Sequence, residues 1–495
     1  MDPARTPVIV GVGQVEDREP NADAALDPVQ LMTAALRAAD ADAGGGWLAV
    51  IDALAVVDQL SFPALNPVVD RVADALGMTP TRREQTAQPM GDSPVRLLNE
   101  AANRIGAGRS EVAAIVGGEA LRTAARRAAA GGERDADAMR RRHGGRPGYR
   151  QRHGLVAPVD VYPLYENATR AAWGQSLAQA QAESGLIWSL MSQVAADNPH
   201  AWLRTRREAV EIVTPSAANR PLAHPYRKLQ VANSAVNQGA GFIVTSLARA
   251  RAAGIADHRL AFVGHGAAAH EPDDVLARDG FAGSAGMRVS LEETLRANAL
   301  DLTDIDLVEL YSCFPCVPKM ARRVLGLPAE RPASIIGGLT FAGGPIGNYM
   351  SHAIAGTVEA LRRGGRRALL FGNGGFATHN HSIVLTAEPL ATTRFPQAFD
   401  RQARADAMRG PVPPLNEDYA GPGTIETFTV LFDRDGMARV GVIVGRSPAG
   451  TRFLAQVPPD DSLAIAFLTD GRAEPVGSAG VAIASGAGLT RWQVG

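Results

Sequence analysis

Cysteine, lysine and long apolar runs are scarce in this chain. Two cysteines in 495 residues exclude a disulfide framework and suit a reducing cytoplasm. The segment Met1-Asp2-Pro3 starts acidic and a strand follows at once, so we expect no signal peptide. No apolar run reaches membrane-spanning length, which predicts no membrane span. Together these absences predict a cytoplasmic location.

The charge balance offers little to a polyanionic partner. The formal net charge is −1, and Lys228 and Lys319 are the only lysines among mostly arginine cations. This balance gives no reason to expect nucleic acid or an acidic membrane as partner. The arginine- and glycine-rich tract 126–152 contains acidic residues and a single aromatic residue, Tyr149, so it indicates a solvated surface loop.

A helix–glycine–strand–glycine unit occurs twice. Residues 93–119 read SPVRLLNEAANRIGAGRSEVAAIVGGE, and residues 345–375 read PIGNYMSHAIAGTVEALRRGGRRALLFGNGG. The strands VIVGVG at 8–13 and LAFVGHG at 260–266 are also alike. With 46% hydrophobic residues, the pattern predicts a soluble, multi-domain α/β protein built from a duplicated unit.

The second copy lies in the stretch 335–382, around which the chain is organised. Glycines around Pro345 precede a helix expected at 348–363 with one apolar face, and such a loop lets a ligand approach the backbone. A strand is expected at 366–371, followed by a sharp turn at 372–375 and the histidines His379 and His381. Polar groups from the two turns are expected to converge.

Further helices are expected around an insertion at 120–227. In the first half, Ser93 is predicted to cap a helix that has Pro94 in its first position. Within the insertion, helices are predicted at about 167–183 and 187–196. An insertion of this size usually covers a site.

The carboxyl-terminal segment changes character. Alternating or apolar runs separated by Asp-Gly and Ala-Gly turns predict a small antiparallel β domain. Its strands are expected at 426–432, 439–445, 451–457 and 462–468. The predicted organisation is a first half at 1–119 plus 228–256, an inserted loop domain at 120–227, a second half at 257–390, a linker at 391–422 and the β domain at 423–495.

Three stretches carry a resemblance to a known family: LVELYSCFPCVPKMARRVLGL (307–327), GGLTFAGGPIGNYMSHAIA (337–355) and VANSAVNQGAGFIV (231–244). In this order they resemble the thiolase superfamily over about residues 6–390. With the added β domain, the chain is similar to the group called thiolase-like protein type 1. The resemblance implies a five-layered αβαβα fold of two duplicated halves with an inserted loop domain.

The same resemblance implies a ligand. Thiolases form or cleave carbon–carbon bonds in acyl-CoA esters, so it implies an acyltransferase of lipid metabolism, similar to an acetyl-CoA acetyltransferase. Coenzyme A or acyl-CoA is the expected ligand, with no covalently bound cofactor. By resemblance to the blocks that line the CoA channel, the residues expected to bind it are Ser234, Ala235, Gly344 and Asn348.

The family's catalytic residues do not carry over. The nucleophilic cysteine falls at Gly91 (or Met90 with a shift of one residue), and the histidine of the Gly-His-Pro block falls at Gly344. The second cysteine falls at Gly372, and the Asn or His of the third block falls at Tyr311. Because the thiolase mechanism needs a nucleophile, a base and an oxyanion hole together, the sequence predicts that it does not operate here.

Other residues are candidates for these roles. Cys313 or Ser93 is a candidate nucleophile, and His352 is a candidate base. His379 is a further candidate because it follows the turn of the lost second cysteine. Tyr311 or Asn373 is a candidate to stabilise an oxyanion. The alternative interpretations are structural: a helix cap for Ser93, a small buried residue for Cys313, and a structural histidine on a helix. Two hypotheses follow, an acyl-CoA enzyme with an altered site or a non-catalytic protein that binds CoA esters.

Metal binding and a docking role complete the alternatives. Cys313 and Cys316 form a C-x-x-C pair, but no second pair exists, so we expect no metal site. We expect the rings of His379 and His381 to lie on opposite faces of a strand, which argues against a metal ion shared by the two. A third hypothesis assigns the carboxyl-terminal domain to binding a protein partner.

Overall fold

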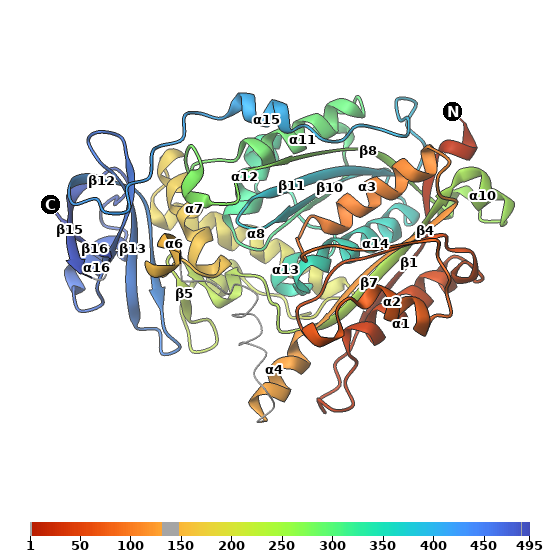
Figure 1. The fold of residues 1–495 in the computed structure, drawn as a ribbon, viewed down its shortest axis with the longest axis horizontal. Helices are drawn as coiled ribbons and strands as arrows, with labels where there is room; N and C mark the ends of the chain where they lie inside the picture. The colour runs from red at the N-terminus through yellow and green to blue at the C-terminus, as the bar shows by residue number, and fades with distance from the viewer. Residues whose placement is uncertain (1, 131–147, 487) are drawn as a thin grey trace.

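Two β-sheets organise the protein. The computed structural model describes residues 2–130, 148–486 and 488–495. Within these residues a nine-stranded sheet has the order β3-β2-β4-β7-β1-β8-β11-β10-β9, and a second sheet has the order β13-β14-β16-β15-β12-β5-β6. The second sheet lies at one end of the molecule, beside the carboxyl terminus (Figure 1). No helix in the described part of the chain is long and apolar enough to cross a membrane.

The nine-stranded sheet consists of two matching halves. In each half a short strand pairs in parallel with a long one, and two antiparallel pairings follow. The halves meet through β1 and β8 at two residue pairs, Val8–Phe262 and Ile9–Ala261. This arrangement confirms the predicted duplication. The strands of the first half are β2 (Ala53–Val56), β4 (Val112–Ala120), β7 (Asn237–Ser246) and β1 (Pro7–Glu16), with β3 (Arg82–Gln85) at its edge; those of the second are β9 (Leu307–Leu310), β10 (Arg367–Gly374), β11 (His379–Thr386) and β8 (Ala261–His270).

Helices separate and cover the two half-sheets. The equivalent helices α3 (Ser93–Gly106) and α14 (Tyr349–Arg362) lie between them, where each contacts strands of both halves. The outer layers contain α1 (Pro28–Asp42) and α2 (Val68–Ala75) on one side and α11 (Ala285–Ala297) with α12 (Cys316–Leu325) on the other. The order α-β-α-β-α confirms the predicted layers.

The central helix α14 corrects one expectation. A single apolar face was predicted, but every residue from Tyr349 to Val358 is buried. The helix is enclosed on all sides because it lies between two sheets, a position that requires apolar or small residues all round. Its neighbour α3 fits the prediction better, since Val95, Leu98, Ala102 and Ile105 are all buried.

Two local predictions near the glycine loops are also corrected. Asp92, not Ser93, occupies the N-cap of α3; Ser93 is the first helical residue, and its Oγ accepts a hydrogen bond from the Met90 N–H at 3.2 Å. The strand β10 continues to Gly374, so Gly372 and Asn373 belong to the strand and not to a turn. Extended pairing with β11 holds them there.

The insertion also differs from its prediction. Its long helices are α7 (Pro158–Ala172) and α8 (Leu177–Asp197), so the predicted helix at 167–183 spans a break. Gly174 has a φ of +67°, and Ser176 forms a capping box with Gln179 that starts a new helix. The middle of the arginine-rich tract, 131–147, lies outside the described residues. The shorter helices of the insertion are α4 (Leu121–Ala129), α6 (Tyr149–Arg152) and α9 (Ala209–Val213). Short helices elsewhere in the body include α10 (Leu247–Ala252), α13 (Gly338–Phe341) and α15 (Gln402–Met408).

The carboxyl-terminal strands close into a barrel. Strand β12 pairs with both β13 and β15, and β14 pairs in parallel with β16. The predicted strand at 462–468 is wrong: Ser462–Thr469 forms helix α16, capped by the Asp461 side chain. Its short apolar run does not distinguish helix from strand. The barrel strands are β12 (Gly421–Phe432), β13 (Ala438–Arg446), β14 (Arg452–Val457), β15 (Ala479–Gly486) and β16 (Leu489–Val494).

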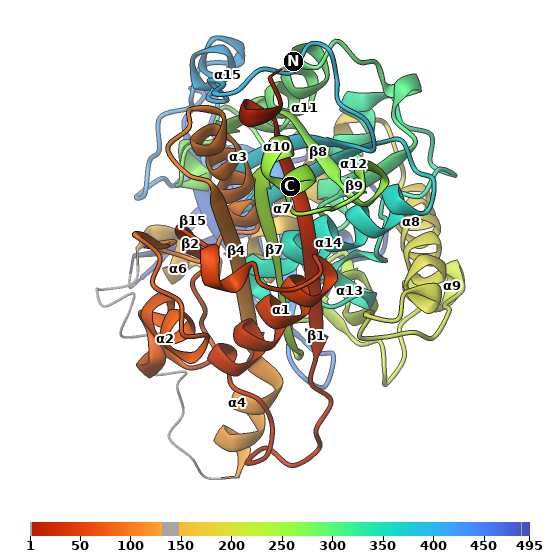
Figure 2. The ribbon, with the colours of Figure 1, turned by 90° about the vertical axis from the view of Figure 1, so that its right-hand side faces the viewer.

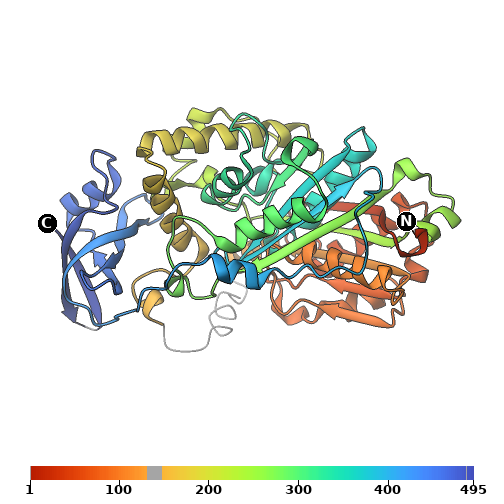
Figure 3. The ribbon, with the colours of Figure 1, turned by 90° about the horizontal axis from the view of Figure 1, so that it is seen from above.

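The barrel is continuous with the insertion. Strands β5 (Pro221–Ala223) and β6 (Tyr226–Arg227) extend its sheet through the pair Leu431–Ala223. Val442, Val444 and Leu454 on the barrel belong to the same buried cluster as the centre of the protein. In Figure 3 the gold insertion helices lie between the blue barrel and the rest of the body.

Candidate functional site

A groove of about 780 Å³ lies where the insertion meets the loop 231–235. Ser234 and Ala235, two of the four residues predicted to bind CoA, line it. The volume is in the range of small-molecule sites. Figure 2 shows α9, which contributes to this groove, on the side of the body opposite α3.

The groove combines apolar and basic side chains. Leu203, 38% exposed, and the partly buried Leu229 and Val231 supply apolar surface. Arg207 and Lys228 supply positive charge; Arg207 lies 3.3 Å from Glu211, and no carboxylate of the described residues lies within 4 Å of the Lys228 ammonium. This lining suits an elongated ligand with an anionic end.

The inner wall of the groove connects to the two glycine loops. The Ala232 N–H donates to the Cys313 carbonyl at 2.9 Å, and the Gly344 N–H donates to the Asn233 carbonyl at 2.8 Å. Gly344 is therefore buried behind the wall of the groove, next to Asn233, and is not one of the lining residues. Asn348 does not line it, because its buried amide donates to the carbonyls of Gly117 and Ala240 in the sheet.

The mapped catalytic positions Gly91, Tyr311 and Gly372 come together behind this wall. A β-carbon added at Gly91 would overlap the Tyr311 ring and the Asn373 carbonyl oxygen. One added at Gly372 would lie 2.9 Å from the Asp92 Cα. The Tyr311 hydroxyl donates to the Ile346 carbonyl at 3.4 Å, in the loop that also contains Gly344. The tyrosine ring thus occupies the space that a side chain at position 91 would need.

Burial raises the pKa values of the groups around Tyr311. The Tyr311 ring meets Tyr349 edge to face at 5.7 Å, and burial raises the pKa of both phenols well above 10. The Tyr349 hydroxyl donates to Glu309 at 2.7 Å. Burial raises the pKa of that carboxyl group to about 7.

Cys313 and Asn373 lie in a structural network on the far side of Tyr311. Burial raises the pKa of the Cys313 thiol to about 12, so it is protonated at neutral pH. The Tyr162 hydroxyl lies 3.1 Å from Asn373 Oδ1 and accepts from the Ala377 N–H at 3.0 Å. The Asn373 amide donates to Asn380 at 2.9 Å. Both ends of the Asn373 side chain are therefore already bonded.

His352 faces away from the candidate nucleophiles. Its Nδ1 lies 2.9 Å from Gln14 Oε1 on β1, and burial lowers the pKa of the ring to about 3. Its Nε2 is buried without a hydrogen-bond partner in the described structure. No hydrogen bond among the described residues joins His352 to Cys313 or Ser93. The structure does not bring the predicted nucleophile and base together.

Comparison with known proteins places this geometry in a family. The domain described as "Thiolase-like protein type 1 additional C-terminal domain" matches residues 404–485. The crystal structure of a monomeric SCP2-thiolase-like protein type 1 from Mycobacterium smegmatis is 31% identical, with complete coverage of both chains and a TM-score of 0.83. The chain belongs to the SCP2-thiolase-like protein type 1 family.

More distant structures share the fold of this thiolase-like protein type 1. Human mitochondrial 3-ketoacyl-CoA thiolase in complex with CoA is 14% identical and covers 79% of this chain and 100% of its own, with a TM-score of 0.59. Acetyl-CoA acetyltransferase from Syntrophomonas wolfei is 14% identical, with coverages of 78% and 100% and a TM-score of 0.58. No curated protein sequence matches the chain.

The thiolase-like protein also contains a cavity residue that sequence reasoning missed, His270. His379 lies opposite His270 on the neighbouring strand β8, with ring centres 4.7 Å apart. Both histidines line a second cavity with Asp92 and Ser93. His381 lies two residues further along β11 and projects from the same face as His379, so the prediction of opposite faces is wrong. Its ring lies 3.0 Å from the Asn99 amide on α3. Only the strand register brings His270 into this site, and no motif around residue 270 signals it.

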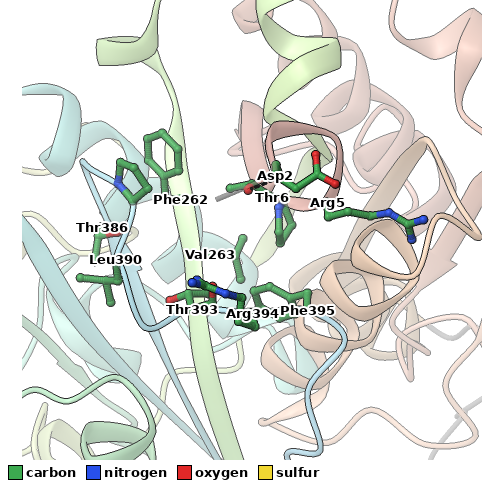
Figure 4. Close-up of a pocket in the computed structure, with 12 residues that line it drawn as sticks. Asp2, Arg5, Thr6, Phe262, Val263, Thr386, Leu390, Thr393, Arg394 and Phe395 are labelled. Atoms are coloured by element: carbon green, nitrogen blue, oxygen red, sulfur yellow. Dashed lines mark hydrogen bonds between the residues drawn. The ribbon is translucent and has the colours of Figure 1, made fainter.

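A third cavity of the thiolase-like protein is too small for a nucleotide-containing ligand. It has a volume of about 70 Å³ and lies beside the short junction of the two half-sheets. Figure 4 shows Arg5, Phe262, Arg394 and Phe395 around it. The groove at Ser234 is the better candidate for a CoA site.

Proposed function

We propose that this thiolase-like protein binds coenzyme A or an acyl-CoA in the groove at Ser234 and Ala235, without the cysteine-based chemistry of thiolases. The observation that carries the proposal is the Tyr311 ring in the space beside Gly91. The setting we propose is cytoplasmic lipid metabolism, where acyl-CoA esters are made and consumed.

The lining of the groove supports this ligand. Lys228 and Arg207 are suited to the phosphates of the nucleotide, because cations bind phosphate by charge-assisted hydrogen bonds. The apolar side chains of Leu203 and Leu229 suit the pantetheine arm. A distant relative with the same fold, the human mitochondrial thiolase, was solved in complex with CoA.

The electrostatics favour binding over acyl transfer. A covalent mechanism needs a nucleophile within hydrogen-bond reach of a base. The Cys313 thiol is protonated at neutral pH, and the His352 ring contacts Gln14 instead of a thiol or hydroxyl. We therefore favour a non-catalytic CoA-ester-binding protein over an acyltransferase.

Isothermal titration with CoA and acetyl-CoA tests the proposal. Lys228→Glu is expected to weaken binding about tenfold, or about 1.4 kcal/mol, because it replaces a phosphate partner with a repelling charge. Arg204→Glu is the matched control, since Arg204 is exposed and lies outside the groove. Absence of saturable binding to the wild type, or equal losses in both variants, would reject the site.

Turnover assays test the second half of the proposal. A panel of acyl-CoA esters is expected to show binding with no thiolysis, condensation or hydrolysis. His352→Ala and Cys313→Ala are expected to bind CoA like the wild type. Turnover by the wild type that either substitution abolishes would restore the acyltransferase hypothesis.

A further inference from the structure

A row of acid–base side chains crosses three strands on the α3 side of the protein. Gly374 on β10 pairs with His379 on β11, and His379 pairs with His270 on β8. Directly paired residues project from the same face of a sheet. A β-carbon added at Gly374 would lie 3.0 Å from Asp92 Oδ1, so the glycine provides the space for this carboxylate. Asp92, His379 and His270 therefore follow one another along the row.

Burial raises the pKa of the Asp92 carboxyl group, and the nearby side chains of His379, His270 and Arg96 oppose this shift. The residue is 3% exposed, and it occupies the N-cap of α3. An N-cap aspartate usually accepts hydrogen bonds from the first turn, but this side chain accepts none there. Among the described residues no other group donates a hydrogen bond to it. A capping role therefore does not account for this carboxylate.

His270 is similarly unsatisfied. Its backbone is fixed by Gln402, which accepts from the His270 N–H at 2.7 Å and donates to its carbonyl at 3.0 Å. Its ring Nδ1 is buried and has no hydrogen-bond partner in the described residues. Burial and the neighbouring His379 lower the pKa of His270, so the ring is neutral at pH 7. Leaving such a buried group unpaired is destabilising.

These groups face a cavity that is separate from the CoA groove. It has a volume of about 630 Å³ and shares no lining residue with that groove. Its other polar lining residues are Arg96, Asp273, Gln88, Ser93 and Thr86. Arg96 pairs with Glu100 at 2.7 Å. The lining thus mixes carboxylate and imidazole acceptors with amide and guanidinium donors.

We propose that Asp92, His270 and His379 form a second ligand site, which binds a small polyhydroxylated molecule. Hydroxyl groups both donate and accept, and so they match the mixed lining. The ligand would supply the hydrogen bonds that Asp92 and the His270 Nδ1 lack. The proposal does not depend on CoA binding, because the two cavities lie on different sides of the body.

Nuclear magnetic resonance of the full-length protein, labelled with carbon-13 at histidine Cε1, tests the site. Glycerol, xylitol, glucose and myo-inositol serve as probes. At least one of them is expected to shift the signals of His270 and His379 saturably while the other histidines stay unchanged. If none shifts these two signals, the proposal is wrong.

Variants separate binding from folding. Asp92→Asn and His379→Gln are each expected to weaken the polyol at least tenfold, whereas Asp70→Asn, an exposed acid outside the cavity, leaves the affinity unchanged. Asp92→Asn is expected to melt at the same or a higher temperature, because burial disfavours the charged carboxylate and the first turn of α3 donates no hydrogen bond to it. Wild-type affinity in both site variants, or a lower melting temperature for Asp92→Asn, would show that the row is structural.

Discussion

At the scale of single residues, Gly91 and Tyr311 are one packing unit. A side chain at position 91 would overlap the tyrosine ring. Gly91→Ala is expected to cost about 1–3 kcal/mol by overpacking, and Tyr311→Ala about 3–5 kcal/mol by leaving a cavity. Removing the ring relieves its overlap with a β-carbon at position 91, although the Asn373 carbonyl oxygen still overlaps that atom. The double variant should therefore recover part of the summed loss, at least about 0.5 kcal/mol in urea unfolding.

The control for this cycle is Gly280→Ala. A β-carbon there meets no atom within 4 Å, so the change should stay within about 0.5 kcal/mol of the wild type. Strictly additive losses at positions 91 and 311 would show that the ring does not fill the space left by Gly91. The resemblance showed that Gly91 stands where the family has its nucleophilic cysteine. It did not show that the Tyr311 ring fills the space beside it, because Tyr311 is far away in the sequence and local patterns do not reveal such a contact.

At the scale of elements, the barrel and the insertion act together. The order β12-β13-β14-β16-β15, with α16 after the third strand, is that of an OB-fold, which binds ligands on its second and third strands. Here that face is covered: Val442 and Leu454 share a buried cluster with Tyr149 and Leu155 of the insertion. The barrel therefore has no free OB-type ligand face.

A matched pair of leucine substitutions tests this packing. Leu454→Asp, which places a charge at a fully buried site, is expected to cost about 3–5 kcal/mol and to lower the melting temperature. Leu463→Asp, at a position that is 84% exposed on the same barrel, should change stability by less than about 0.5 kcal/mol. Similar melting curves for the two variants in scanning fluorimetry would mean that the barrel is only loosely attached.

Elements were predictable where periodicity was strong. The strands around 8–13, 260–266 and 366–371 and the helix α3 followed from their apolar spacing, whereas the polar edge strand β3 was not predicted. The break at Gly174 and the helix α16 did not, because a capping box or a short apolar run is ambiguous without its tertiary neighbours. For the same reason the row of Asp92, His379 and His270 depended on strand register, which is a property of the folded sheet.

At the scale of the whole molecule, buried groups of opposite kind govern the response to acid. Burial lowers the pKa of His224, His352 and His381 to about 3. Burial raises the pKa of Glu119 and Glu309 to about 7. Between pH 6.5 and 4.5 the unfolded chain therefore gains protons at the histidines, while the native state holds extra protons at the two glutamates. The histidines reduce stability as pH falls, and the glutamates oppose that loss.

Single substitutions separate the two contributions. His381→Gln removes one buried histidine whose protonation favours the unfolded chain. Below pH 6.5 the unfolding free energy of this variant should therefore fall more slowly than that of the wild type, with a difference of about 1.4 kcal/mol per pH unit. Glu309→Gln removes a carboxyl group whose protonation stabilises the native state increasingly as pH falls from 7 to 4.5. The unfolding free energy of this variant should therefore fall more than that of the wild type over that range. Urea unfolding at pH 7.5, 6.0 and 5.0 measures both differences. Parallel curves for the two variants, or deviations of the same sign, would show that these buried groups do not set the acid stability.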